Sequence, residues 1–193
     1  MSTFKLHTLA SAPAGSLPLL EAANKGLGFI PNLYAQLAEA PSALQAYKQI
    51  GALLEQSSLT PEEQQVVLIA VSVENQCEYC VAAHSFLARN MVKVPANVIS
   101  ALRDGQPLAN AKLNALALFT RAVVQKRGRL AGSQVLKNFF AAGYTPQHAL
   151  EVVLGVAMNT LGNYANNLID TPLDAAFAGE AWEANSEEAC CAH

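Results

Sequence analysis

Residues 59–90 read LTPEEQQVVLIAVSVENQCEYCVAAHSFLARN, and the first half of this stretch predicts a buried helix. Thr60 and Pro61 are typical of a helix start, because threonine accepts a hydrogen bond from a free backbone N–H and proline suits the first turn. Glu63 completes a capping box with Thr60. The residues from Val66 to Val73 are almost all apolar, which is too uniform for a surface helix. We therefore expect this helix to lie in the centre of the fold.

A second helix of the same style is predicted from Thr145 onward. Its apolar residues recur at spacings of three and four: Leu150, Val153, Ala157, Leu161, Tyr164 and Leu168. Laying Thr60 on Thr145 also superposes pairs of identical residues: Pro61 with Pro146, Val67 with Val152, Val71 with Val156, and Tyr79 with Tyr164. This correspondence hints at an internal duplication.

The rest of the chain shows further helical patterns and hardly any strand alternation. Shorter helices are predicted over residues 42–56, 95–103, 110–127 and 133–142, and the last three are closed by Gly105, Gly128 and Gly143. No linker is long enough to divide this set. We predict one all-α domain of about seven or eight helices over residues 25–178, with an N-terminal arm (1–24) and a C-terminal tail (179–193).

Composition limits the possible partners. The chain has 193 residues, of which 52% are apolar and 14% charged, and its mean hydropathy is +0.20. A monomer of this size usually hides less apolar surface than this, so we expect a homo-oligomer. The net charge of -3, the pI near 5.8 and the lack of a long basic block argue against nucleic acid as a partner.

The ends of the chain and its cysteines indicate the compartment. The N-terminal sequence MSTFKLHTLASAPAG lacks the apolar core of a secretory signal, and no apolar run approaches the roughly 20 residues that span a bilayer. The four cysteines form two close pairs, unlike those of a disulfide-stapled secreted domain. We expect a cytoplasmic protein without a membrane segment. In the polar C-terminal tail, a frayed end is favoured for Cys190 and Cys191 over an accessory thiol or soft-metal role.

The second half of the opening stretch carries the candidate site. The central helix is expected to end near Asn75, which is a plausible N-cap for a new helix from Cys77 to about residue 90. On that helix Cys77, Cys80 and His84 stand at i, i+3 and i+7, which places them on one face. Two cysteines at a helix start can close a disulfide across one turn, and the helix dipole there stabilises a thiolate. His84, one turn beyond Cys80, can take or relay its proton.

Other interpretations of the pair are weaker. A structural zinc site normally needs four ligands, whereas Cys77, Cys80 and His84 supply three and no second Cys-x-x-Cys lies nearby. Two inert core cysteines remain an alternative, although burial alone leaves the histidine in register with both unexplained. Thioredoxin fits poorly because its Cys-x-x-Cys follows a strand. Tyr79, between the cysteines, is more often a packing residue than a catalytic one.

These residues carry a family resemblance. Residues 59–90 resemble the core motif of the carboxymuconolactone decarboxylase/alkylhydroperoxidase D superfamily, in its redox branch with Cys-x-x-Cys-x-x-x-His, and the likeness extends less sharply over residues 25–175. The segments GFIPNLY (28–34) and NYANNLIDTPLD (163–174) also resemble peroxidase-related members. Cys77, Tyr79 and His84 match the oxidoreductase half of sestrins, which lack the second cysteine.

The resemblance implies a peroxidatic cycle. Cys80 would attack a hydroperoxide and form a sulfenic acid, Cys77 would resolve it as a disulfide, and His84 would serve the proton relay. No tightly bound cofactor is implied. The resemblance instead implies an external dithiol, such as a lipoyl group on a partner protein, that reduces the disulfide, and an assembly of two, three or six copies.

The sequence departs from the family pattern at one place. The redox members carry a glutamate twelve residues before the first cysteine, where this chain has Gln65. Glutamine cannot accept a proton at neutral pH, so the relay must be weak or rerouted. Glu74 is one candidate substitute, whereas for Glu62 and Glu63 a role in capping is favoured.

Two further functions stay open. One is a γ-carboxymuconolactone decarboxylase-type lyase, which does not depend on a Cys-x-x-Cys pair, and the other is a non-enzymatic helical redox sensor. The amides of Asn163, Asn166 and Asn167 form a polar cluster on an otherwise apolar helix. They either face the thiols or cap the helix end, and the structural role is favoured.

Overall fold

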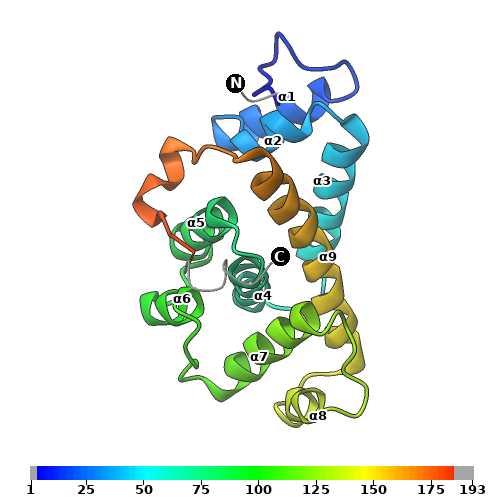
Figure 1. The fold of residues 1–193 in the computed structure, drawn as a ribbon, viewed down its shortest axis with the longest axis vertical. Helices are drawn as coiled ribbons and strands as arrows, with labels where there is room; N and C mark the ends of the chain where they lie inside the picture. Colours follow the sequence, from blue (N-terminus) through cyan, green and yellow to red (C-terminus); the bar gives the residue numbers. More distant parts are fainter. Residues whose placement is uncertain (1–3, 185–193) are drawn as a thin grey trace, which may run out of the picture.

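The computed structural model describes residues 4–184, which form nine α-helices and no strand (Figure 1). The all-α prediction is confirmed, and the two helices beyond the seven that periodicity located are short N-terminal ones, α1 and α2. None of the helices in this part of the chain is long and apolar enough to cross a membrane. Cys190 and Cys191 lie outside the described residues. The helices are α1 Leu17–Leu27, α2 Asn32–Leu37, α3 Pro41–Glu55, α4 Pro61–Glu74, α5 Glu78–Leu87, α6 Ala96–Arg103, α7 Ala111–Gln125, α8 Gln134–Ala141 and α9 Pro146–Ile169.

Helix α4 is the central element, as its apolar sequence predicted. Its start carries the expected capping box, in which the Thr60 hydroxyl accepts from the N–H of Glu63 and the Glu63 carboxylate accepts from the N–H of Thr60. Every residue from Val66 to Ser72 is buried. Figure 1 shows α4 nearly end-on, surrounded by α5, α6, α7 and α9. A helix buried on all sides positions whatever follows its C-terminal end.

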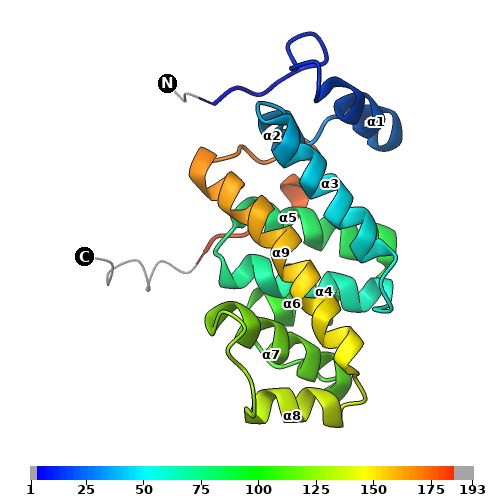
Figure 2. The same cartoon turned by 90° about the vertical axis from the view of Figure 1, so that its right-hand side faces the viewer.

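Helix α9 is the longest element and crosses α4 while packing against α3 (Figure 2). Its start has a capping box between Thr145 and His148. Two glycines permit the close approach, because a Cβ at Gly155 would lie 2.9 Å from a Val67 methyl group and one at Gly162 would lie 2.9 Å from the Tyr47 ring. Most of the periodic apolar residues seen in the sequence lie on the outer face of this helix, whereas Leu161 is partly buried against the core. Its inner face carries a different set: Val152, Gly155, Met158, Asn159, Gly162, Asn163 and Asn166.

The core has two parts that differ in content. One, around α6, α7 and α8, is wholly apolar and centres on Phe139, whose ring stacks on Phe119 at 4.2 Å and on Tyr144 at 4.5 Å. The other, around α1, α2, α3 and α5, contains Cys77 and Cys80. The two thiols therefore belong to the core half that also packs against the N-terminal helices.

A C-terminal 3-10 turn, η2 (Ala175–Glu180), holds α5 from outside. Phe177 packs edge-on against Phe29 and Tyr79 at centroid distances of 5.9 and 6.0 Å. The Glu180 carboxylate pairs with Arg89 at 2.5 Å and with Arg103 at 3.3 Å. This turn fixes α5 against the rest of the core.

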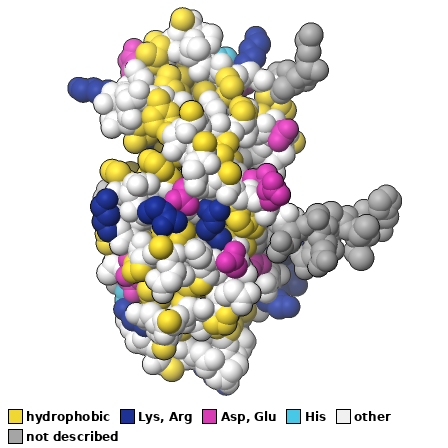
Figure 3. Space-filling view, turned by 90° about the vertical axis from the view of Figure 1, so that its left-hand side faces the viewer, with side chains coloured by type: hydrophobic (Ala, Val, Ile, Leu, Met, Phe, Trp, Pro, Cys, Tyr) yellow, Lys and Arg dark blue, Asp and Glu magenta, His cyan; other side chains and the backbone are white. Residues whose placement is uncertain are grey.

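On the side of the molecule seen in Figure 3, basic and acidic side chains lie next to one another across the middle.

Candidate active site

Cys77 is the N-cap of α5. Its backbone is extended, with φ -95° and ψ 96°, and its Sγ accepts from the N–H of Cys80 at 3.4 Å. The prediction that Asn75 caps this helix is wrong: Asn75 is the C-cap of α4, and Gln76 at φ 52° makes the turn between the two helices. The helix also ends earlier than predicted, at Leu87, and continues as a π-helical turn over residues 88–92. The first cysteine therefore lies directly at the positive end of the helix dipole.

Both thiols are free and buried, with exposed fractions of 0% for Cys77 and 2% for Cys80. The hydrogen bond that Cys77 receives from the Cys80 side chain lowers its pKa, in opposition to burial. Burial raises the pKa of Cys80, and its bond to Cys77 raises it further. In the reduced pair, negative charge is thus favoured at Cys77, with Cys80 as the protonated partner.

Cys80 has a further partner on α9. The Nδ2 of Asn166 donates to Cys80 Sγ at 3.1 Å. The Oδ1 of Asn166 is buried and has no hydrogen-bond partner among the described residues. The structure therefore places one amide of the polar cluster against the thiols, which corrects the favoured structural role for this residue.

His84 is held by a second asparagine of α9. Its Nε2 lies 3.2 Å from Asn159 Oδ1, while the Nδ2 of Asn159 donates to the Leu68 carbonyl at 2.6 Å and to Ser72 Oγ at 2.7 Å. Because both Nδ2 protons are used, Asn159 offers His84 an acceptor, which assigns the proton of the neutral imidazole to Nε2. Nδ1 is then a buried lone pair without a partner in residues 4–184. Burial lowers the pKa of His84 to about 4, so the ring is neutral at pH 7.

The remaining asparagines support the turn between α4 and α5. Asn75 Nδ2 donates to Asn163 Oδ1 at 2.9 Å, and Asn163 Nδ2 lies 3.5 Å from Ser72 Oγ. Asn167 Nδ2 donates to the Asn75 carbonyl at 2.9 Å. For Asn167 the structural role matches the contact, whereas the Asn163 side chain also hydrogen-bonds to the thiols of Cys77 and Cys80. The signal for all of them was present in the sequence as amides on an otherwise apolar helix.

Tyrosines surround the pair. The Tyr79 hydroxyl donates to Asp174 Oδ2 at 2.5 Å and accepts from the N–H of Leu33 at 3.4 Å. Burial, with help from Asp174, raises its pKa far above the ordinary value, so it stays protonated and ties α5 to the N- and C-terminal segments. Tyr47 was missed as a site residue. It is buried, and burial is the largest cause of its raised pKa, followed by the neighbouring Tyr34 and then Cys80.

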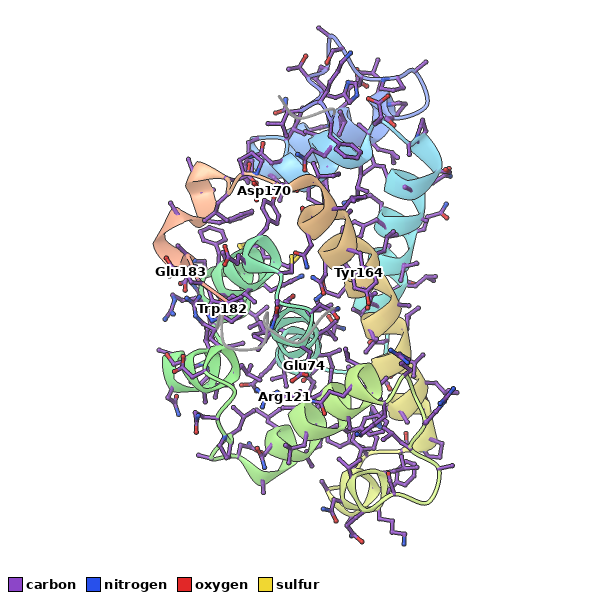
Figure 4. The ribbon with its side chains drawn as sticks, viewed as in Figure 1. Glu74, Arg121, Tyr164, Asp170, Trp182 and Glu183 are labelled. Atoms are coloured by element: carbon purple, nitrogen blue, oxygen red, sulfur yellow. The ribbon has the colours of Figure 1, made fainter. Side chains whose placement is uncertain are left out.

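The carboxylates considered for the relay bind elsewhere. Glu74 accepts from Gln125 Nε2 at 2.8 Å and lies 3.8 Å from Arg121 Nε, both on α7 (Figure 4). Glu63 serves the capping box and also accepts from the Tyr144 hydroxyl at 3.0 Å. Gln65 Oε1 is buried without a partner in the described part of the chain. The side chain that hydrogen-bonds to His84 is thus the neutral amide of Asn159.

The site has few metal-binding features. Within residues 4–184, no group of three or more histidine, cysteine, aspartate or glutamate side chains is arranged to hold a metal ion. The amide network occupies Nε2 of His84. The site instead contains two free thiols and a neutral imidazole, groups that can exchange protons and electrons.

An all-helical protein with a buried Cys-x-x-Cys-x-x-x-His helix is the class that this fold and site define. The sequence model of the Carboxymuconolactone decarboxylase family matches residues 38–122, which include α3, α4, α5 and the site. No curated protein sequence matches the chain. A solved "peroxidase-related protein" from Ralstonia eutropha JMP134, described as an alkylhydroperoxidase AhpD core, superposes with a TM-score of 0.78 at 23% identity, covering 91% of this chain and 94% of that one.

Two further structures share the fold. A peroxidase-related protein from Silicibacter sp. TM1040 has a TM-score of 0.77 at 18% identity, over 93% of this chain and 95% of its own. The debrominase Bmp8 in complex with 2,3,4-tribromopyrrole has a TM-score of 0.74 at 19% identity, over 93% of this chain and 97% of its own. The family model thus matches the part of the chain that contains the candidate site, and the solved structures share its fold.

Proposed function

We propose that the protein is a thiol-dependent antioxidant oxidoreductase that reduces hydroperoxides with Cys77 and Cys80. The observation that carries this proposal is the pair of free thiols at the start of α5, joined by hydrogen bonds and followed one turn later by a neutral histidine. The peroxidase-related structural neighbours add support. A buried pair with one thiol favoured as thiolate is suited to two-electron chemistry.

The proposed cycle balances without a metal or flavin. A thiolate attacks the distal oxygen of ROOH, the O–O bond breaks, and the alkoxide takes a proton and leaves as ROH. The attacking cysteine is then a sulfenic acid. The second thiol attacks that sulfur, releases water and forms the Cys77–Cys80 disulfide. Two thiols are oxidised for each peroxide reduced.

The assignment of the attacking cysteine needs a proton shift. The resemblance assigns attack to Cys80, whereas the reduced pair favours charge on Cys77. We propose that the shared proton moves to Cys77 as substrate enters, leaving a Cys80 thiolate beside the Asn166 amide. Dimedone trapping of a sulfenic acid checks this order: Cys77→Ser should be labelled at Cys80, and labelling at Cys77 in Cys80→Ser alone would reverse it.

The reductant is proposed to be an external dithiol, such as a lipoyl group carried by a partner protein. Both sulfurs are almost fully buried, so a slender arm reaches them more easily than a folded surface does. No tightly bound cofactor is needed for this cycle. The four cysteines form two close pairs, unlike those of a disulfide-stapled secreted domain, which supports a cytoplasmic location.

The test is turnover of tert-butyl hydroperoxide with excess dihydrolipoamide by the wild type, Cys77→Ser and Cys80→Ser, with thiols counted before and after one equivalent of peroxide. The wild type should turn over and both variants should lose turnover. Loss of two thiols once, without turnover, would indicate the redox sensor instead. Retention of all thiols would overturn the proposal.

A second candidate is reductive dehalogenation, which the likeness to the debrominase Bmp8 favours. The oxidation of two thiols to a disulfide supplies the same two electrons for removal of a halogen as halide. Incubation of the reduced protein with a bromopyrrole and measurement of bromide release distinguishes the two substrates. A lyase of the carboxymuconolactone type would instead act equally well in the absence of both cysteines.

We also propose that the protein works as a homo-oligomer through α9. Four large apolar side chains on its outer face are exposed: Leu150, Val153, Tyr164 and Leu168. A groove of about 320 Å³ between α7 and α9 adjoins them, with Val123, Val124 and Val156 in its walls. Residues 152–169 carry no charged side chain. A second copy of an uncharged, apolar helix face is a suitable cover for such a surface.

A further inference from the structure

Asn166 has contacts that fold stability does not explain. Its side chain is 3% exposed, and its amide hydrogen-bonds to the sulfurs of both cysteines, with the bond to Cys80 Sγ at 3.1 Å. Its Oδ1 is buried without a donor. A buried carbonyl oxygen without a donor destabilises the folded state, so an apolar residue would serve packing better at this position.

The backbone around Asn166 is nevertheless tightly defined. The backbone carbonyl of Asn166 accepts from the N–H groups of Asp170 and Thr171, which close the end of α9. One turn earlier, Gly162 lets α9 lie against the ring of Tyr47. The amide is therefore held at the sulfur by its helix and not by its own hydrogen-bond network.

We propose that Asn166 is a catalytic hydrogen-bond donor that stabilises the Cys80 thiolate. This inference rests on the proposed thiol chemistry and adds a residue to it. An N–H donor binds an anionic sulfur more strongly than a neutral thiol, so it favours the form that attacks. It offsets part of the burial that otherwise keeps Cys80 protonated. As charge leaves the sulfur during attack on the substrate, the same bond keeps Sγ in position.

The test measures the thiolate itself. In a Cys77→Ser background, alkylation of Cys80 by iodoacetamide is followed across pH by mass spectrometry of the Cys80 peptide. Asn166→Leu should move the midpoint of the pH profile upward by about one unit, a roughly tenfold loss of thiolate below it, because a bond to a charged group is lost. Asn166→Asp should move it further, because a carboxylate would then face the sulfur.

Thermal unfolding separates this role from a structural one. Asn166→Leu should unfold at the same temperature as the wild type or higher, since it removes an unpaired buried oxygen. A lowered unfolding temperature with an unchanged alkylation midpoint would overturn the proposal. Asn167→Leu is the matched control: it lies next along the helix, its amide binds the Asn75 carbonyl, and it should leave the midpoint unchanged.

The readout uses neither peroxide nor reductant. If hydroperoxides prove not to be substrates but the midpoint shifts, Asn166 still tunes the thiol and the substrate assignment alone fails. If peroxide turnover is present and Asn166→Leu leaves both turnover and midpoint unchanged, this inference fails and the proposed function stands.

Discussion

The two faces of α9 are inverted relative to an ordinary surface helix. Its inner face buries three amides, of Asn159, Asn163 and Asn166, against the thiols and α4. Its outer face exposes Leu150 by 72% and Leu168 by 73%. An isolated domain gains stability from the opposite arrangement. We propose that the thiol site accounts for the inner polarity and a partner surface for the outer apolarity.

The comparison also separates two kinds of polar burial. Asn159 uses its oxygen and both Nδ2 protons, so it fixes the histidine and the end of α4 together. Asn166 leaves its oxygen unpaired and touches a sulfur. Asparagines seven residues apart on one face therefore differ in what they contribute: one stabilises the fold, the other modifies a reactive group.

Asn159→Ala should have the largest effect on stability. It removes hydrogen bonds to Leu68, Ser72 and His84 and leaves buried groups unpaired, which should lower the free energy of unfolding by about 4 kcal/mol. Urea unfolding measures the loss. Asn167→Ala, on the exposed side of the same helix, is the control and should cost less than about 1 kcal/mol. Equal losses in the two variants would contradict the proposed difference between the faces.

The pH dependence of stability should report His84. Its pKa in the folded protein is lowered by burial from 6.5 to about 4. Above the ordinary pKa the ring is neutral in both states. Between the unfolded-state and folded-state pKa values, only the unfolded chain binds the proton. The free energy of unfolding therefore decreases as the pH is lowered, and the loss reaches about 3 kcal/mol below the pKa of the folded protein.

Urea titrations of the wild type and His84→Gln from about pH 7 to about pH 4 test this, because titrating carboxylates contribute to both proteins alike. The wild type should lose more stability than the variant over that range. Parallel losses in the wild type and His84→Gln would show that the imidazole does not resist protonation.

Gly162→Ala tests how tightly the inner face is packed. The added Cβ would lie 2.9 Å from the Tyr47 ring, and overpacking should outweigh the better helix propensity of alanine and cost about 1–2 kcal/mol. Gly26→Ala in α1 is the opposite control, since a Cβ there meets nothing within 4 Å and should stabilise by about 0.5–1 kcal/mol. Thermal unfolding of both variants gives the comparison. If Gly162→Ala stabilised the protein as Gly26→Ala does, α9 would have shifted to accommodate the added Cβ at this contact.

The sequence predicted the helices well because their signals are local. The Thr-Pro starts at Thr60 and Thr145 both became capping boxes, and α4 is buried as its uniform apolarity indicated. The N-cap of α5 was misplaced at Asn75 because Cys77 is an uncommon cap, and its sulfur replaces the usual oxygen acceptor. Local rules are least reliable where a functional residue takes a structural position.

The site was predictable along α5 and not across to α9. Periodicity placed Cys77, Cys80 and His84 on one helix because their spacing is local: the cysteines lie at the start of α5 and His84 lies in its last turn. The contact between His84 and Asn159 joins residues 75 positions apart, and no spacing rule reveals it. The apolar stripe of α9 was recognised as helical, but its spacing could not tell an inner face from an outer one. One pair from the suggested duplication differs in environment, because Tyr79 is buried and Tyr164 is 63% exposed.

Making the outer face of α9 polar should have the smallest effect on the stability of the folded monomer. Tyr164→Gln and Leu168→Gln combined should change the stability of the monomer by no more than about 0.5 kcal/mol per site, because both side chains are largely exposed. Association should change far more: light scattering should show an oligomer for the wild type and a monomer for the variant. Subunit association should also make the wild-type melting temperature rise with protein concentration, while that of the variant stays constant. A monomeric wild type with a concentration-independent melting temperature would contradict self-association through α9. The thiol site would then account for the polar inner face, and the apolar outer face would require a partner other than a second copy.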